Sequence, residues 1–92
     1  MTSLWHLTQK KERLKREIGE NLDILIGSVS TKGPMRTGFN LTTKIEQKTV
    51  SRHIRKSVIE RVRRMTRRHQ KLKRLIQELS QTNWEIIKRE SE

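Results

Sequence analysis

Lysine and arginine residues crowd into one segment of this chain, and they are the residues best suited to chemistry with a partner. Residues 55–74 contain ten Lys or Arg and one acid, Glu60. Most carboxylates that would form i,i+4 ion pairs are missing, so the charges repel one another unless a polyanion neutralises them. Concentrated positive charge of this kind predicts contacts with phosphate groups. The candidate nucleic-acid-binding residues in this segment are Lys56, Arg61, Arg63, Arg64, Arg67, Arg68, Lys71 and Arg74.

Four further basic residues outside the segment are added to the candidate site. They are Lys32 and Arg36 in a Gly-rich stretch, and Lys48 and Arg52 in a stretch with strand character. The predicted function is binding to the phosphate backbone of structured RNA or duplex DNA, contacts that position a protein without reading base sequence. Three alternatives stay open for the basic face: a solvated outer face of a coiled coil, an acidic protein, or a membrane surface. The rival function is therefore a coiled-coil structural adaptor that binds an acidic protein partner.

Residue types that perform catalysis are present but scattered. His6, His53 and His69 fall on three different predicted elements, and the acids lack the spacing of known metal-ligand motifs. The chain has no Cys, which excludes disulfides and Cys-ligated zinc. We therefore expect no enzyme activity, no catalytic residues, no metal site and no cofactor.

The basic segment begins the longest predicted element, a helix over residues 55–91. This stretch has no Gly or Pro and would be about 50 Å long. Positions that recur with alternating spacings of four and three predict a coiled-coil seam. The seam positions are Val58, Val62, Met65, His69, Leu72, Ile76, Leu79, Asn83 and Ile86.

Three shorter elements precede the long helix. An amphipathic stripe that includes Leu7, Leu14 and Leu25 predicts a helix over residues 1–27. Gly and Pro predict a loop over residues 28–38, and alternating residues predict a two-stranded hairpin over 39–54 with its turn at 45–48. The outer face of this hairpin would carry polar side chains that suit phosphate and sugar but are also ordinary strand residues. They are Asn40, Lys44, Thr49, Ser51 and His53.

The composition predicts one small, mainly α-helical domain over residues 1–92, in which the two helices form an antiparallel helical hairpin or coiled coil. Of its residues, 30% are hydrophobic and 35% are charged, so the core is thin and a partner is expected to complete it. No apolar run is long enough to span a bilayer, and the N-terminus does not resemble a signal peptide. We expect a cytoplasmic protein with no membrane contact.

The C-terminal part of the long helix predicts a protein contact. Residues 75–92 hold two bases and four acids, which does not suit phosphate. The first helix, at about 36 Å, is too short to cover the whole seam. Leu75, Leu79, Ile86 and Ile87 are then expected to be partly exposed and to bind a second copy or a different protein, with Asn83 fixing the register. Trp5 and Trp84 are predicted to be packing residues.

Several short motifs resemble a family of small, uncharacterised prokaryotic proteins often found beside mobile-element genes. The motifs are Gly27-Ser28-Val29, Gly33-Pro34, Leu41-Thr42-Thr43-Lys44, Lys48-Thr49-Val50-Ser51-Arg52, Leu72-Lys73-Arg74-Leu75-Ile76-Gln77-Glu78-Leu79 and Asn83-Trp84-Glu85. The resemblance implies a helix, a Gly-rich loop, a hairpin and a long C-terminal helix. It also implies a mobile-element setting but no activity; together with the basic segment, this setting leads us to expect an accessory subunit of a mobile-element or other nucleoprotein complex. The family's loop cysteines are absent here, and with them any metal site they imply.

Overall fold

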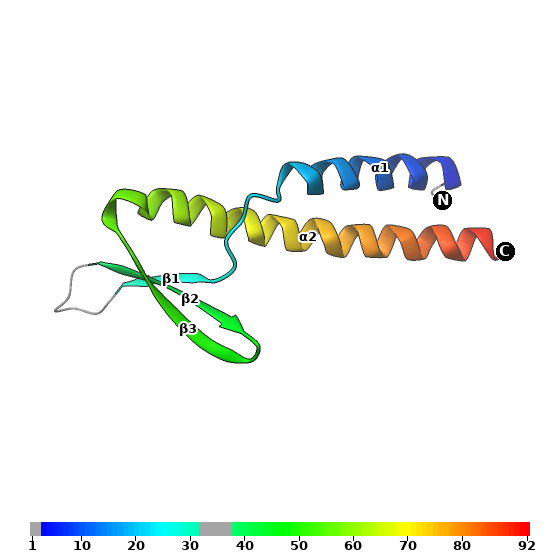
Figure 1. Cartoon of the computed structure of the whole chain (residues 1–92). Coiled ribbons are helices and arrows are strands. Elements are labelled where there is room, and N and C mark those ends of the chain that lie inside the picture. Colours follow the sequence, from blue (N-terminus) through cyan, green and yellow to red (C-terminus); the bar gives the residue numbers. More distant parts are fainter. Residues whose placement is uncertain (1–2, 32–37) are drawn as a thin grey trace. The chain divides into compact units, whose positions relative to one another are not determined.

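The computed structural model describes residues 3–31 and 38–92. Its elements are helix α1 (Leu4–Glu20), strands β1 (Ser28–Thr31), β2 (Phe39–Ile45) and β3 (Lys48–Ile54), a 3-10 turn (Lys56–Val58) and helix α2 (Ile59–Glu90) (Figure 1). The predicted fold class is confirmed: an N-terminal helix, an antiparallel sheet and a long C-terminal helix.

The chain divides into two compact units, and α2 contributes to both. Unit 1 comprises Met1–Leu22 and Gln70–Glu92, and unit 2 comprises Asp23–His69.

Helix α1 has a polar cap at each end. The Ser3 hydroxyl accepts a hydrogen bond from the His6 backbone N–H at 3.2 Å, and Asn21 Nδ2 donates to the Glu17 carbonyl at 2.7 Å. The predicted continuation of this helix to residue 27 is wrong. Gly19 weakens the last turn, and the Asn21 side chain occupies a carbonyl near the helix end, so the helix terminates there.

In unit 1, α1 runs antiparallel to the C-terminal part of α2 (Figure 1). Both helices contribute buried residues to this unit. They are Leu7 and Leu14 on α1, and Leu72, Leu75 and Thr82 on α2. Leu14 is the most deeply buried side chain in the described chain, with 1% of its surface exposed. The small core therefore depends on a few leucines.

The seam of α2 in unit 1 is not the predicted one. The buried positions are Leu72, Leu75 and Thr82, and the half-buried ones are Leu79, Asn83, Glu85, Ile86 and Arg89. The predicted seam residue Ile76 is instead 50% exposed. Both series follow heptad spacing and share Leu72, Leu79 and Ile86, but exchanging Ile76 and Asn83 for Leu75 and Thr82 turns the mean contact face by roughly 40°. Packing against α1 selects the series that contains Leu75 and Thr82.

Unit 2 contains a three-stranded antiparallel sheet in the order β1-β2-β3. The hairpin of β2 and β3 is confirmed, with Phe39 opposite Ile54 and Ile45 opposite Lys48. The assignment of residues 28–31 to a loop is wrong, because they form β1 and pair with β2 from Ser28 opposite Thr42 to Thr31 opposite Phe39. A lone hairpin is marginal, and the third strand adds the pairing and apolar contacts that it lacks.

The hairpin turn has an uncommon sequence for its geometry. Glu46 and Gln47 both lie in the left-handed region, with φ of 50° and 68°. Two consecutive positive φ values define the turn that best matches the twist of two-residue hairpins, and Asn-Gly is its usual sequence. The turn therefore forms because the paired strands on either side impose it.

Gly27 allows β1 to begin close against β2. Its φ is 147°, and a Cβ at this position would lie 2.7 Å from the Thr42 carbonyl oxygen and 2.9 Å from Leu41 Cδ1. Both the backbone conformation and the space therefore require glycine.

We expect Gly27→Ala to lower the free energy of unfolding by about 2–3 kcal/mol, through left-handed strain and the displacement of β1. Urea denaturation followed by circular dichroism measures this loss. Gly19→Ala is the matched control, because nothing lies within 4 Å of a Cβ there and helix propensity should rise. Equal stability of the Gly27→Ala variant and the unmutated protein would contradict this account.

Candidate nucleic-acid interface

The N-terminal part of α2, within unit 2, has two chemically distinct sides. Apart from Arg63 and Arg68, its half-buried positions recur with helical spacing at Ile59, Val62, Met65, Thr66 and His69. With about 100° between successive residues, positions 61, 64 and 67 fall on the opposite side of the helix. The fold of unit 2 therefore directs basic side chains away from its small core.

Arg61, Arg64 and Arg67 form what we call the open arginine arc. All three residues are exposed, and none forms an ion pair or side-chain hydrogen bond with another residue in the described ranges. An Arg guanidinium presents five N–H donors in a planar fork that matches phosphate oxygens. The arc can therefore bind phosphates without first breaking an internal ion pair.

Arg63 is a predicted site residue that the fold uses internally. Its Nη1 donates to Glu60 Oε1 at 3.1 Å, and its guanidinium carbon lies 5.1 Å from the centre of the Phe39 ring. Phe39 belongs to β2, so this cation–π contact connects the helix to the sheet. Arg63 is only half exposed as a result.

Arg68 also has a structural role. Its Nη1 donates to the Asp23 backbone carbonyl at 2.6 Å and lies 3.6 Å from Asp23 Oδ2. Two residues later, the Leu25 N–H donates to the Met65 carbonyl at 3.3 Å. These contacts hold the segment that leads into β1 against α2. Arg63 and Arg68 are therefore weaker candidates for phosphate binding than the open arginine arc.

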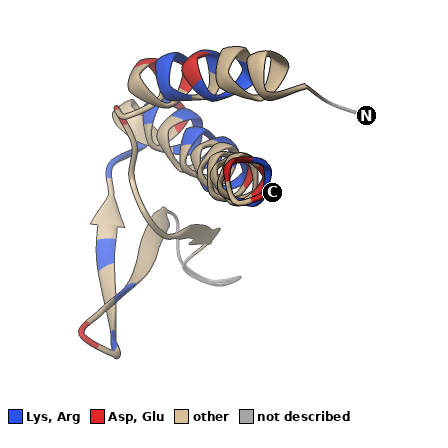
Figure 2. Ribbon diagram, turned by 90° about the vertical axis from the view of Figure 1, so that its right-hand side faces the viewer, with Lys and Arg blue, Asp and Glu red and all other residues tan. Residues whose placement is uncertain are grey.

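Lys48 and Arg52 project from one face of the sheet in unit 2. Arg52 pairs with Leu41, so both residues share the face that also carries Phe39 and Ile54. Both Lys48 and Arg52 are exposed. Basic positions on the hairpin strands are visible in Figure 2.

The opposite face of the sheet is polar across all three strands. The register places Ser28, Thr42 and Ser51 in one row, and Thr42 Oγ1 lies 3.2 Å from Ser51 Oγ. A second row contains Ser30, Asn40 and His53. Sequence reasoning predicted the hairpin residues of this face except Thr42, and it missed Ser28 and Ser30. Their alternation with Val29 and Thr31 was the available signal.

The remaining predicted residues are dispersed. Lys56 is exposed in the 3-10 turn that precedes α2. Lys71 and Arg74 are exposed on the part of α2 that belongs to unit 1. Lys32 and Arg36 lie outside the described residues.

The structure also reveals exposed apolar residues that sequence reasoning assigned to packing. Trp5 is 65% exposed and Trp84 is 56% exposed, so the packing prediction is wrong for both indoles. On α2, Ile76 and Ile87 are exposed as well, whereas Leu75 is buried. The predicted hydrophobic surface therefore exists: Ile87 is exposed and Leu79 and Ile86 are half-buried, as expected, while only Leu75 is buried and Ile76 and Trp84 are added. The sequence signal for this surface is a second series of apolar residues along α2, spaced three and four residues apart.

The residues at 3–31 and 38–92 contain no cluster of three or more His, Asp or Glu side chains. Within the same ranges, neither helix combines the length and apolarity that crossing a membrane requires. Comparison of the chain with protein-family models, curated proteins and solved structures finds no match.

Proposed function

We propose that this protein binds nucleic acid through the phosphate backbone and that the open arginine arc is the principal contact. The observation that carries the proposal is three exposed arginines without a carboxylate partner among the described residues. They stand in a 20-residue segment with ten bases and one acid, and Arg63 already uses that acid. A polyanion supplies the charge that the segment lacks.

Phosphate contacts of this kind hold a protein on a nucleic acid without specifying sequence. Lys56 adds to the arc from the preceding turn, and Lys48 and Arg52 supply a second group on the hairpin. The sheet face that carries Ser28, Thr42 and Ser51 has no Phe, Tyr or Trp, so it offers mainly hydroxyls to sugar and phosphate rather than large rings to bases. These features support structured RNA or duplex DNA as the ligand.

The proposal assigns the protein a binding role, with no catalytic activity. The resemblance to proteins encoded beside mobile elements adds a setting: an accessory subunit of a nucleoprotein complex in the cytoplasm. The exposed apolar residues of α2 support a protein partner in addition to nucleic acid, either a second copy or a different protein.

The salt dependence of binding tests the proposed function. If about five phosphates are neutralised, the logarithm of the association constant should fall with the logarithm of salt concentration with a slope of roughly −4 to −5. Fluorescence anisotropy with labelled duplexes of unrelated sequence measures the slope, which should be similar for all of them. A nearly flat dependence would contradict phosphate binding.

Nuclease treatment separates the proposal from an adaptor for an acidic protein. A nucleic-acid-binding protein purified at low salt should carry ultraviolet absorbance that nuclease removes. An adaptor should instead retain an acidic protein after the same treatment.

A further inference from the structure

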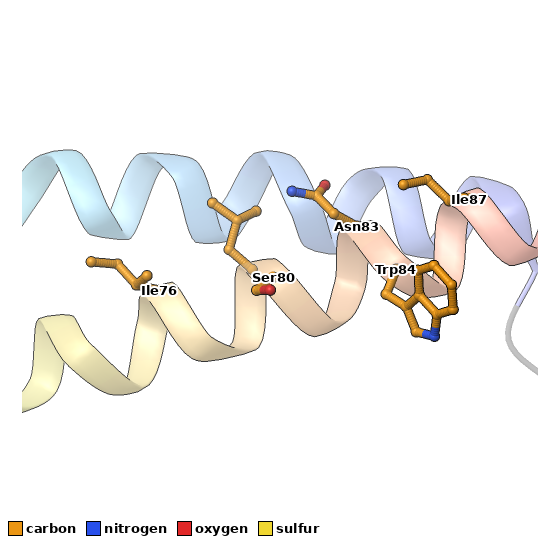
Figure 3. Close-up of a pocket in the computed structure, with 6 residues that line it drawn as sticks. Ile76, Ser80, Asn83, Trp84 and Ile87 are labelled. Atoms are coloured by element: carbon orange, nitrogen blue, oxygen red, sulfur yellow. The ribbon is translucent and has the colours of Figure 1, made fainter.

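One side of α2 in unit 1 carries an apolar stripe that the α1 contact does not cover. We use the name C-terminal stripe for Ile76, Ser80, Asn83, Trp84 and Ile87, which line a shallow hollow with Leu79 along successive turns of α2 (Figure 3). Ile76, Trp84 and Ile87 are 50%, 56% and 55% exposed. Three large apolar side chains left half in water along one helix face are typical of an interaction surface.

A buried polar atom at the edge of the C-terminal stripe also lacks a partner. Asn83 Oδ1 is buried and has no hydrogen-bond partner among the residues described. Asn83 as a whole is only half-buried, so a change of its side-chain rotamer would let Oδ1 accept from a donor that arrives at the stripe. An occupant that brings a hydroxyl or an amide would satisfy this atom.

The charge of the surrounding helix restricts the choice of occupant. Residues 75–92 hold two bases and four acids, so this end does not attract a polyanion. The whole chain carries a formal net charge of +12, and most of it comes from residues 55–74, which contain ten bases and one acid. The C-terminal stripe is therefore a place where two copies of this basic chain can meet with little repulsion.

We propose that a second copy of this chain occupies the C-terminal stripe, with the two α2 helices antiparallel. Centring the contact between residues 80 and 83 places Ile76 of one copy opposite Ile87 of the other. The same register places Ser80 opposite Asn83, so a hydroxyl reaches the unpartnered amide. A parallel arrangement would bring the two basic segments of α2 side by side, which like-charge repulsion disfavours.

The size of the contact sets the expected affinity. Residues 73–90 cover a helix length of about 26 Å, and two helices packed over that length bury roughly 1,000 Å² in total. This area lies at the low end of specific interfaces, so we expect a dissociation constant on the order of 10 µM.

Sedimentation equilibrium of the full-length chain, without nucleic acid and from roughly 1 to 500 µM, tests the dimer across its expected dissociation constant. The unmutated protein should approach twice its 11.0 kDa mass at the upper concentrations. The double variant Ile76→Glu/Ile87→Glu should remain monomeric, because the stripe would then carry four carboxylates across the interface. Both side chains are half exposed in the single chain, so its circular dichroism should be unchanged.

A matched control places the same charges elsewhere on unit 1. Trp5→Glu/Leu22→Glu alters two apolar residues that are 65% and 60% exposed but lie outside the C-terminal stripe, and it should dimerise normally. A monomer for the unmutated protein at every concentration would overturn the proposal. So would a dimer that survives in the Ile76→Glu/Ile87→Glu variant. Because nucleic acid is absent, neither result bears on the open arginine arc, which the salt titration tests separately.

Discussion

Replacing Arg61, Arg64 and Arg67 together with Gln should weaken binding to a nucleic-acid duplex by roughly 500-fold at about 0.1 M salt. Each phosphate contact contributes close to 0.9 to the slope of the logarithm of affinity against the logarithm of salt concentration. The triple variant should therefore also show a slope less steep by about 2.7. Fluorescence anisotropy over a range of salt concentrations measures both quantities.

A control variant removes the same number of charges from another exposed helix face. Lys10, Lys15 and Arg16 are exposed on α1, where acids such as Glu12 balance the local charge. Their replacement with Gln should change affinity by less than about ten-fold, because only long-range attraction is reduced. If both triple variants lost the same affinity, net charge rather than the open arginine arc would explain binding.

The Arg61/Arg64/Arg67 variant differs structurally from a variant that also replaces Arg63 and Arg68. Arg63 contacts Glu60 and Phe39, and Arg68 contacts Asp23, so replacing them removes packing within unit 2 as well as charge. The arc residues have no such internal contacts among the described residues. Their replacement should leave the free energy of unfolding within about 0.5 kcal/mol of that of the unmutated protein.

Leu14→Ala should lower the free energy of unfolding of unit 1 by about 3–4 kcal/mol. Leu14 is 1% exposed, and removing its side chain leaves a cavity in a core that has few other leucines. For a small protein of marginal stability, this loss is large enough to unfold α1 from the C-terminal part of α2. Thermal denaturation followed by circular dichroism near 222 nm, the usual wavelength for helix, measures the loss.

Leu22→Ala is the control for this prediction, since Leu22 is 60% exposed and little apolar surface would be lost. Its unfolding free energy should change by less than about 0.5 kcal/mol. A Leu14→Ala variant as stable as the original would mean that α1 contributes little to the fold.

Local pattern alone determined much of this protein. The long stretch without Gly or Pro predicts α2, because nothing in it interrupts helical hydrogen bonding. Strict alternation predicts β2 and β3, because side chains of a strand point to opposite faces in turn. The position of the basic segment depends only on the order of residues and needs no structure. These features are encoded within a few neighbouring residues, so the sequence reveals them directly.

Contacts between distant residues decided the rest. Alternative heptad series run along α2, and the contact with α1 selects the one with Leu75 and Thr82, which leaves Ile76 exposed. Strand β1 is short and polar, and it exists because β2 offers an open edge beside Gly27. Arg63 and Arg61 have the same side chain, yet only Arg63 meets Phe39. Local propensity and periodicity do not specify which distant residue a side chain will contact. These tertiary contacts determine which arginines remain available to a ligand.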